Sequence, residues 1–420
     1  MKRLFLLIAV IGVPALAQHE HQMPMPMPKP QAQPQHEHMQ HEMQMQHDAV
    51  ADFLMQQASG TSSNPAAAPM HMSMLHYRGW MLMDHASLFA GQIVQTGDRG
   101  GDQLFSANWF MGIAERKLGP GHLMLRTMLS LEPLFLGKRG YPELFQTGET
   151  AHGRPLIDRQ HPHDFFMELA AEYAVDVGNG TIGYVYAAPV GDPALGPVAF
   201  PHRISAMEIP QATLSHHLQD STHIASSVLT IGAKRGQFGL GVSGFRGREP
   251  DENRWDIDQG RIDSWGIRGT WDPSPQWTAQ ISTGHLKDPE ANEPGNIQRT
   301  TASATFVSGD WSSSLIWGHN HKRDHSIDGV TLESNLRFNV SNYVTGRLEI
   351  VDKDELLPGV FKVKALTVGY TKDLFRARDL LGGVGGNVTA YAIPSELKSS
   401  YGNRPLSFYA FVRFRSPSMH

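Results

Sequence analysis

The fold class is decided by residues 331–340, whose sequence is TLESNLRFNV. Leu332, Leu336 and Phe338 share one face, and the opposite face carries Thr, Glu, Asn and Arg, with Ser334 as the exception to the alternation. Successive side chains of an extended strand point to opposite faces, whereas a helix repeats every 3.6 residues. The stretch therefore predicts a β-strand with one apolar and one polar face.

The same alternation recurs along most of the chain after about residue 71. It is clear in residues 237–246, 276–286 and 407–414. We count about seventeen candidate strands and expect about sixteen, because bacterial single-chain membrane barrels have even numbers of strands. The doubtful candidate is 72–84, which we interpret as a plug, a partial strand or a continuation of the preceding segment.

Short and long connections alternate between the predicted strands. Tight turns are predicted at residues 178–180, 235–236, 272–275, 309–310 and 341–342, and long polar connections near 134–162, 190–222, 247–260, 288–297 and 323–329. Tight turns on one rim and long loops on the other are typical of outer-membrane barrels. The predicted fold class is all-β, an antiparallel transmembrane β-barrel of about 16 strands. A soluble β-sandwich or propeller is the alternative, although no blade-length repeat supports a propeller.

Aromatic residues near strand ends agree with a membrane barrel, because Trp and Tyr gather at membrane–water interfaces. Six of them fall on faces predicted to be apolar: Trp265, Trp271, Trp277, Trp311, Trp317 and Tyr343. The last predicted strand carries Phe408, Phe411 and Phe414, an aromatic ending similar to that of assembled outer-membrane proteins.

The first 70 residues differ in composition from the rest. Residues 1–17 place Lys2 and Arg3 before an apolar run that ends in Ala-Leu-Ala, the pattern of a secretory signal peptide cleaved after Ala17. Residues 18–70 lack a periodic apolar face, so we predict a disordered periplasmic segment with a helical turn or two within 48–57. Residues 71–420 then form the barrel, with the protein in the cell outer membrane.

The composition limits the available chemistry. The chain has no cysteine, which excludes thiolate metal sites, iron–sulfur clusters and cysteine nucleophiles. The net charge is −5, and no Lys/Arg cluster suggests nucleic-acid binding. Any metal site must therefore use His, Met or carboxylate ligands.

Histidine and methionine alternate in the segment before the barrel. The candidate ligands are His19, His21, Met23, Met25, Met27, His36, His38, Met39, His41, Met43, Met45 and His47, and Met70, His71, Met72, Met74 and His76 extend the pattern toward the barrel. Thioether sulfur suits Cu(I) and imidazole suits Cu(II), so copper fits this segment better than zinc. A low-complexity linker without a metal role is the alternative.

A second group of histidines lies in the long loops. The candidate metal ligands there are His161, His163, Asp164, His216, His217 and His223, with His152, His202, His319, His321 and His325 elsewhere. These residues are open to three interpretations: hydrogen bonding that packs the loops into the barrel mouth, metal coordination, or a catalytic His-Asp pair. Loops of this length and composition often fold inward, where they would meet lumen-facing charges such as Arg268, Arg337, Arg347, Glu333, Glu349 and Arg413.

The order of segments resembles that of the copper-resistance outer-membrane proteins of the CopB type, in which a signal peptide and a Met/His-rich segment precede a barrel. Met83-Asp84-His85 matches the Met-Asp-His unit of that family. The segment from Phe145 through Arg159-Gln-His-Pro-His-Asp164 resembles a loop sequence of a bacterial outer-membrane family without an assigned function. The first resemblance implies copper handling.

The leading hypothesis is a non-enzymatic outer-membrane barrel that binds or passes metal ions, copper foremost, as part of envelope metal handling. Copper ions are then the expected cofactor, and outer-membrane lipid, metal ions or small solutes and periplasmic metal-handling proteins are the expected partners. A general diffusion porin is one alternative. An outer-membrane hydrolase that uses His216 or His223 with Ser215 or Ser221 is another, although no G-x-S-x-G element is present.

Overall fold

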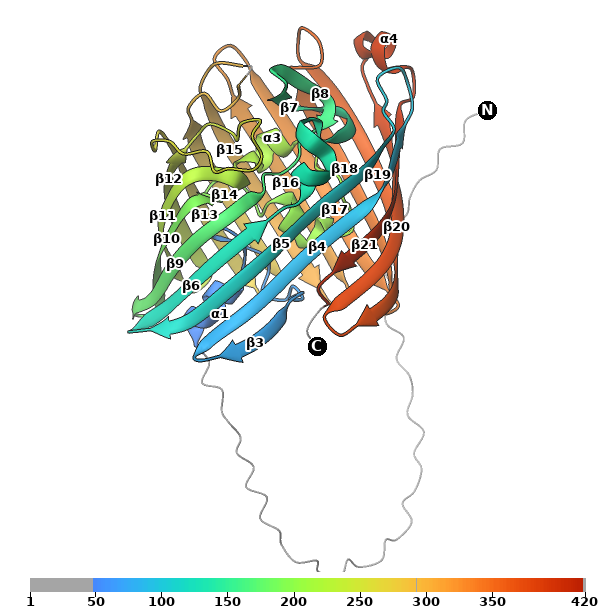
Figure 1. Cartoon of the computed structure of the whole chain (residues 1–420). Coiled ribbons are helices and arrows are strands. Elements are labelled where there is room, and N and C mark those ends of the chain that lie inside the picture. Colours follow the sequence, from blue (N-terminus) through green and yellow to red (C-terminus); the bar gives the residue numbers. More distant parts are fainter. Residues whose placement is uncertain (1–47, 292, 418–420) are drawn as a thin grey trace, which may run out of the picture. The chain divides into compact units, whose positions relative to one another are not determined.

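The computed structural model describes residues 48–291 and 293–417, and it shows a closed antiparallel β-barrel (Figure 1). The predicted fold class is confirmed, with sixteen strands around the wall. In chain order they are β4 (Trp80–Gln95), β5 (Gln103–Leu118), β6 (Gly121–Leu129), β9 (Phe166–Gly178), β10 (Thr181–Gly191), β11 (Ala225–Arg235), β12 (Phe238–Arg246), β13 (Ser264–Ser274), β14 (Trp277–Leu286), β15 (Ile297–Ser308), β16 (Trp311–His321), β17 (Ser326–Phe338), β18 (Asn342–Lys353), β19 (Phe361–Ala377), β20 (Leu380–Ala392) and β21 (Leu406–Arg415).

The barrel closes where the last strand meets the first. Strand β21 pairs with β4 from Ser407 opposite Gln95 to Arg415 opposite Ser87. The short strand β3 (Ser73–Tyr77) pairs with the first residues of β4, so β3 and β21 lie end to end along the same side of β4. Residues 72–84 are therefore a partial strand followed by the start of a wall strand, which is one of the three interpretations offered by the sequence.

The two rims differ as the sequence predicts. Tight connections lie at residues 119–120, 179–180, 236–237, 275–276, 309–310, 339–341 and 378–379. The opposite rim carries the long loops 96–102, 130–165, 192–224, 247–263, 287–296, 322–325, 354–360 and 393–405 (Figure 1). We call these the turn rim and the loop rim. Among the described residues, no helix is long and apolar enough to span a bilayer.

The outer face is apolar because alternate residues of each strand point away from the lumen. Leu315, Leu332, Leu348 and Leu366 are paired in register on β16 to β19, and each side chain is exposed. A closed barrel satisfies its backbone hydrogen bonds internally, so such an apolar band can face lipid.

Of the six aromatic residues predicted to lie on the apolar outer face, five do so. Trp265, Trp271, Trp277, Trp311 and Trp317 are exposed on the outside. The prediction is wrong for Tyr343, which is buried on the lumen side and donates a hydrogen bond to Asp373. The guanidinium carbon of Arg413 lies 5.4 Å from the centroid of the Tyr343 ring. Charged lumen residues therefore hold this tyrosine inside the barrel.

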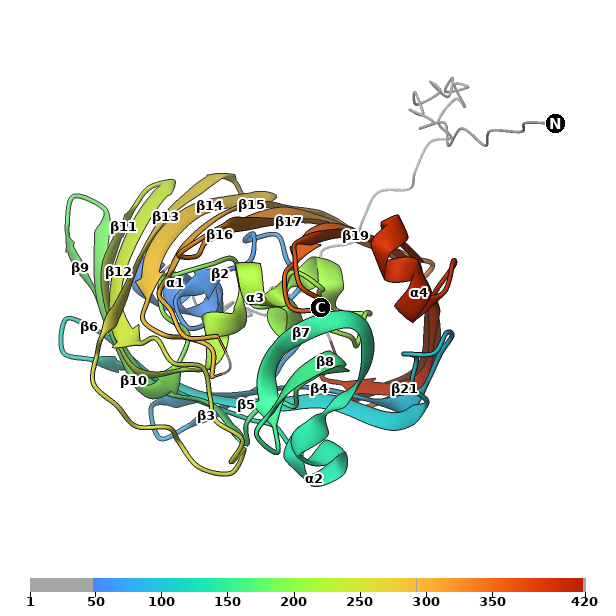
Figure 2. The ribbon, with the colours of Figure 1, turned by 90° about the horizontal axis from the view of Figure 1, so that it is seen from above.

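Two of the long loops fold into the lumen (Figure 2). The first carries α2 (Glu132–Leu136), η1 (Gly137–Arg139) and the hairpin β7 (Tyr141–Ala151) with β8 (Arg154–Gln160). The second carries η2 (Phe200–His202), η3 (Ile204–Ala206), α3 (His216–Gln219) and η4 (Ser221–Ile224). On the loop rim beyond β20 lie η5 (Ser395–Leu397) and α4 (Lys398–Tyr401).

Residues 48–70 also lie inside the barrel, so the prediction of disorder up to residue 70 is wrong for this part. They form α1 (Ala49–Met55), β1 (Gln57–Ser59) and β2 (Ser62–Ser63). Asp48 caps α1 by accepting hydrogen bonds from the backbone of Val50 and Ala51. Phe53 and Leu54 pack with Met124 and Tyr184 on the wall, and this apolar cluster explains why the segment folds.

Ion pairs join the inner loops to the wall. Glu333 on β17 accepts a hydrogen bond from Arg347 of β18 at 2.9 Å and forms an ion pair with Arg203 of the second loop at 3.0 Å. Arg413 of β21 pairs with Glu208 at 2.5 Å, and all of these side chains are buried. Five of the six charges predicted to line a polar channel are instead buried, and the sixth, Arg337, pairs with Asp310 at the turn rim.

Candidate metal centre

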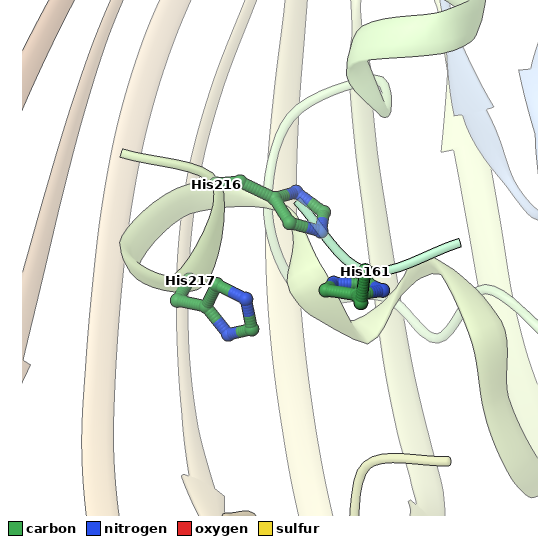
Figure 3. A group of neighbouring side chains, drawn as sticks. All are labelled: His161, His216 and His217. Atoms are coloured by element: carbon green, nitrogen blue, oxygen red, sulfur yellow. The ribbon is translucent and has the colours of Figure 1, made fainter. Parts of the chain in front are cut away.

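Three loop histidines that the sequence proposes as ligands come together inside the barrel. His161 follows β8, and His216 and His217 open α3. One ring nitrogen of each lies within 4.8 Å of the others, and all three side chains are buried (Figure 3). Two nitrogens bound to one ion at about 2 Å each are at most about 4 Å apart, so small side-chain shifts would bring the three imidazoles to coordination distance.

A carboxylate lies beside the Nδ1 atom of each of the three imidazoles. The Nδ1 atom is hydrogen-bonded to Asp220 at 2.7 Å in His216 and to Glu249 at 3.2 Å in His217. In His161 the Nδ1 atom is hydrogen-bonded to the backbone oxygen of Pro162 at 3.3 Å, with Glu149 3.2 Å away. The three Nε2 atoms are buried and have no hydrogen-bond partner. A carboxylate on one ring nitrogen fixes the tautomer that leaves the lone pair of the other free for a metal.

The charges around the three histidines differ. Burial keeps the pKa of His161 well below its ordinary value and also lowers that of His216, so both are neutral at physiological pH. Burial alone would lower the pKa of His217 as well, but the Glu249 carboxylate raises it to about 9. Before an ion binds, His217 and Glu249 therefore form a buried ion pair.

The loop backbone is shaped to let His217 approach. Gly148 has a positive φ of 111°, and a Cβ atom built on it would lie 2.3 Å from the His217 Nε2. Any other residue would occupy the space in front of the free nitrogen. Glu149 follows directly with φ of 60°, so the same turn presents the carboxylate that holds His161.

Two more candidate histidines lie beside the three. His163 has its Nδ1 atom 3.0 Å from Glu132, and His223 has its Nδ1 atom 2.8 Å from the backbone oxygen of Asp220. Their rings are 5.4 Å apart, and the ring of His223 is 5.3 Å from that of His216. Both Nε2 atoms are buried without a partner, so the described chain holds a continuous group of five such imidazoles.

The remaining sequence candidates have other positions. Asp164 accepts a hydrogen bond from Arg254 at 3.1 Å, which makes it an anchor for that arginine. The candidates from His19 to His47 and the signal peptide lie outside the described residues. The sequence gives no signal for Glu149 or Glu249 as partners of these histidines, and Glu249 reaches His217 only through the folding of a separate loop, 247–263.

The described residues give no geometric support to a serine–histidine pair. The Ser215 hydroxyl is 2.6 Å from that of Thr331, and the Ser221 hydroxyl accepts from Arg299 at 3.0 Å. The Nε2 atoms of His216 and His223 meet neither serine. His216 and Asp220 have the arrangement of a base and its orienting acid, but neither Ser215 nor Ser221 is hydrogen-bonded to the His216 ring.

The comparisons with known proteins bear on the fold. No protein-family model and no curated protein matches the sequence. The structure is similar to that of an anion-selective porin from Comamonas acidovorans, with a TM-score of 0.54, 10% identity, and coverage of 80% of this chain and 99% of that chain. It is also similar to the OmpF of Salmonella typhi in complex with daunomycin, with a TM-score of 0.52, 9% identity, and coverage of 82% and 100%. The chain thus has the barrel fold of outer-membrane porins.

Proposed function

We propose that this chain is an outer-membrane barrel that binds a transition-metal ion, copper foremost, on His161, His216 and His217. The observation that carries the proposal is the gathering of three buried imidazoles: one ring nitrogen of each lies within 4.8 Å of the others, a carboxylate lies near each Nδ1 atom, and the Nε2 atoms have no hydrogen-bond partner. The turn rim would face the periplasm and the loop rim the exterior. The role is non-enzymatic, and periplasmic metal-handling proteins are candidate partners.

The ligand set favours a borderline divalent ion over Mg²⁺ or Ca²⁺, which take oxygen ligands. Three imidazoles suit Cu²⁺, Zn²⁺ or Ni²⁺, and Cu²⁺ leads the affinity order for such sites. Copper is preferred over zinc because the sequence also concentrates methionine beside histidine before the barrel. The resemblance to copper-resistance proteins points the same way and remains a prediction.

The test is metal binding by the full chain in detergent. Cu²⁺ is titrated against a competing chelator, and the bound ion is examined by electron paramagnetic resonance. We expect one tight site with nitrogen ligands in the wild type and its loss in His161→Asn. His152→Asn, a change of an exposed histidine in the same loop, serves as the control. Equal tight-site affinity in wild type and His161→Asn would refute the assignment.

A general diffusion porin is the second candidate, and the porin-like fold supports it. The buried ion pairs between the inner loops and the wall favour a small conductance instead. Planar-bilayer recording separates the two functions. A wide, stable pore that is indifferent to Cu²⁺ would support the diffusion porin over a metal-selective role.

A further inference from the structure

A second group of soft and nitrogen donors lines a separate cavity nearer the turn rim. The cavity has a volume of about 520 Å³. Its thioether and imidazole side chains are those of Met55, Met70, His71, Met72, His85, Met111 and His202. His85 lies five residues after the start of β4, close to the turn at 78–79. Met111 lies in the half of β5 that leads to the turn at 119–120. The cavity is therefore nearer the turn rim than the loop rim.

The nitrogen donors of the cavity are available for a ligand. His202 is buried, and neither of its ring nitrogens has a hydrogen-bond partner. The Nδ1 atom of His71 is also buried and without a partner. The indole of Trp109 lies 4.3 Å from the ring of His202 and 4.6 Å from that of His85, so it fixes both imidazoles on the cavity wall.

The cavity differs chemically from the centre formed by His161, His216 and His217. No carboxylate holds His71 or His202 among the described contacts, and Asp52 is the one acidic residue in the lining. Burial keeps the pKa of His202 well below its ordinary value, so the imidazole is neutral. Neutral imidazoles with thioethers form a soft, low-charge environment, which suits a monovalent soft cation.

A path of donors connects the two places. A small cavity of about 40 Å³ is lined by both His85 and His163. The ring of His163 lies 5.4 Å from that of His223, which in turn is 5.3 Å from His216. A series of imidazoles therefore continues from the turn-side cavity to the centre.

We propose that the Met/His cavity is a separate binding site for a soft monovalent metal ion, Cu(I) or its analogue Ag⁺, on the turn side of the barrel. The proposal deepens the metal-binding function and rests on it. The cavity takes the ion from the periplasmic side, and its Cu(I) site is independent of the Cu²⁺ site at the centre.

The probe is Ag⁺, which is soft and does not change oxidation state, titrated into the full chain in detergent and chloride-free buffer. The test variant is Met70→Leu/Met72→Leu/Met111→Leu, because leucine replaces methionine at similar volume without the sulfur. We expect this variant to lose one tightly bound Ag⁺ equivalent and to keep tight Cu²⁺ binding. Met74→Leu, which removes an exposed methionine on β3, should bind Ag⁺ as the wild type does.

The Ag⁺ and Cu²⁺ measurements test the cavity site and the three-histidine centre independently. Unchanged Ag⁺ binding by the triple variant overturns the cavity site, whereas unchanged Cu²⁺ binding by His161→Asn overturns the centre. Should the triple variant not fold, wild-type protein with ¹³C-methyl methionine gives the answer, with assignments from single Met→Leu variants. One Ag⁺ equivalent should shift the Met70 and Met72 methyl signals, and signals that stay in place would overturn the cavity site.

Discussion

At the residue scale, the pair of His217 and Glu249 shows what holds a ligand in place. Glu249 lies 3.2 Å from the Nδ1 atom of His217, so it would orient the ring of a ligand on which the Nε2 atom is left for an ion. A protonated His217 ring would repel a metal ion. Binding therefore requires His217 to lose a proton, after which Glu249 orients the neutral imidazole.

Glu249→Gln should weaken Cu²⁺ binding by about 10- to 100-fold, the usual effect of losing a carboxylate behind a ligating histidine. Chelator competition on the purified full chain measures the change. Glu396→Gln, an exposed carboxyl on the loop rim, is the matched control and should leave the affinity unchanged. An equal effect of the two substitutions would contradict the positioning role of Glu249.

Sequence reasoning at this scale identified the histidines and missed their partners. His161, His216 and His217 stood out because imidazoles cluster in two loops of unusual composition. Glu149 and Glu249 carried no comparable signal, since carboxylates are common in loops and their approach depends on backbone turns such as the one at Gly148.

At the scale of elements, β17 carries two charged lumen residues in different surroundings. Glu333 is fully buried between Arg203 and Arg347, whereas Arg337 pairs with Asp310 at the turn rim with about a third of its side chain exposed. The ion pair between Arg203 and Glu333 attaches the second loop to the wall inside the barrel, whereas the ion pair between Arg337 and Asp310 lies at the surface.

Glu333→Gln should lower the free energy of unfolding by about 3–5 kcal/mol, because it leaves two arginines buried with less compensation. Arg337→Gln should cost less than about 1 kcal/mol, as exposed ion pairs do. Denaturant unfolding followed by tryptophan fluorescence measures both. Similar losses for the two variants would show that the inner loop is not fastened through Glu333.

The strands were more predictable than the loops for a physical reason. Each wall strand shows its two environments as a period of two along the chain, so residues 331–340 were enough to recognise one. The folding of residues 48–70 into the lumen depends on Phe53 and Leu54 meeting Tyr184, a contact more than 120 residues away that no local pattern records.

At the scale of the whole molecule, the apolar exterior should respond to charge according to depth. Leu332 is paired with leucines on both neighbouring strands, while Leu336 lies opposite Trp311 near the turn rim. We expect Leu332→Arg to cost about 2–4 kcal/mol and Leu336→Arg about 0–1 kcal/mol, because the cost of a charge falls toward the interface.

Refolding into lipid vesicles at graded denaturant concentrations measures these costs. Asn335→Arg is the lumen control, since Asn335 lines a cavity of about 160 Å³ that also contains Asp310. It should be tolerated better than Leu332→Arg. A loss that does not depend on depth would mean that the leucine band is not in contact with lipid.

The pairing of β21 with β4 also sets the time at which the proposed centre can form. His161, His216 and Glu249 come from three loops whose positions depend on the closed wall, and Glu208 ties the second loop to Arg413 on the very last strand. A chain still travelling toward the membrane therefore lacks the finished centre. If the centre binds metal as proposed, occupancy is a property of completed molecules, and excess ions would load assembled barrels without trapping unassembled ones.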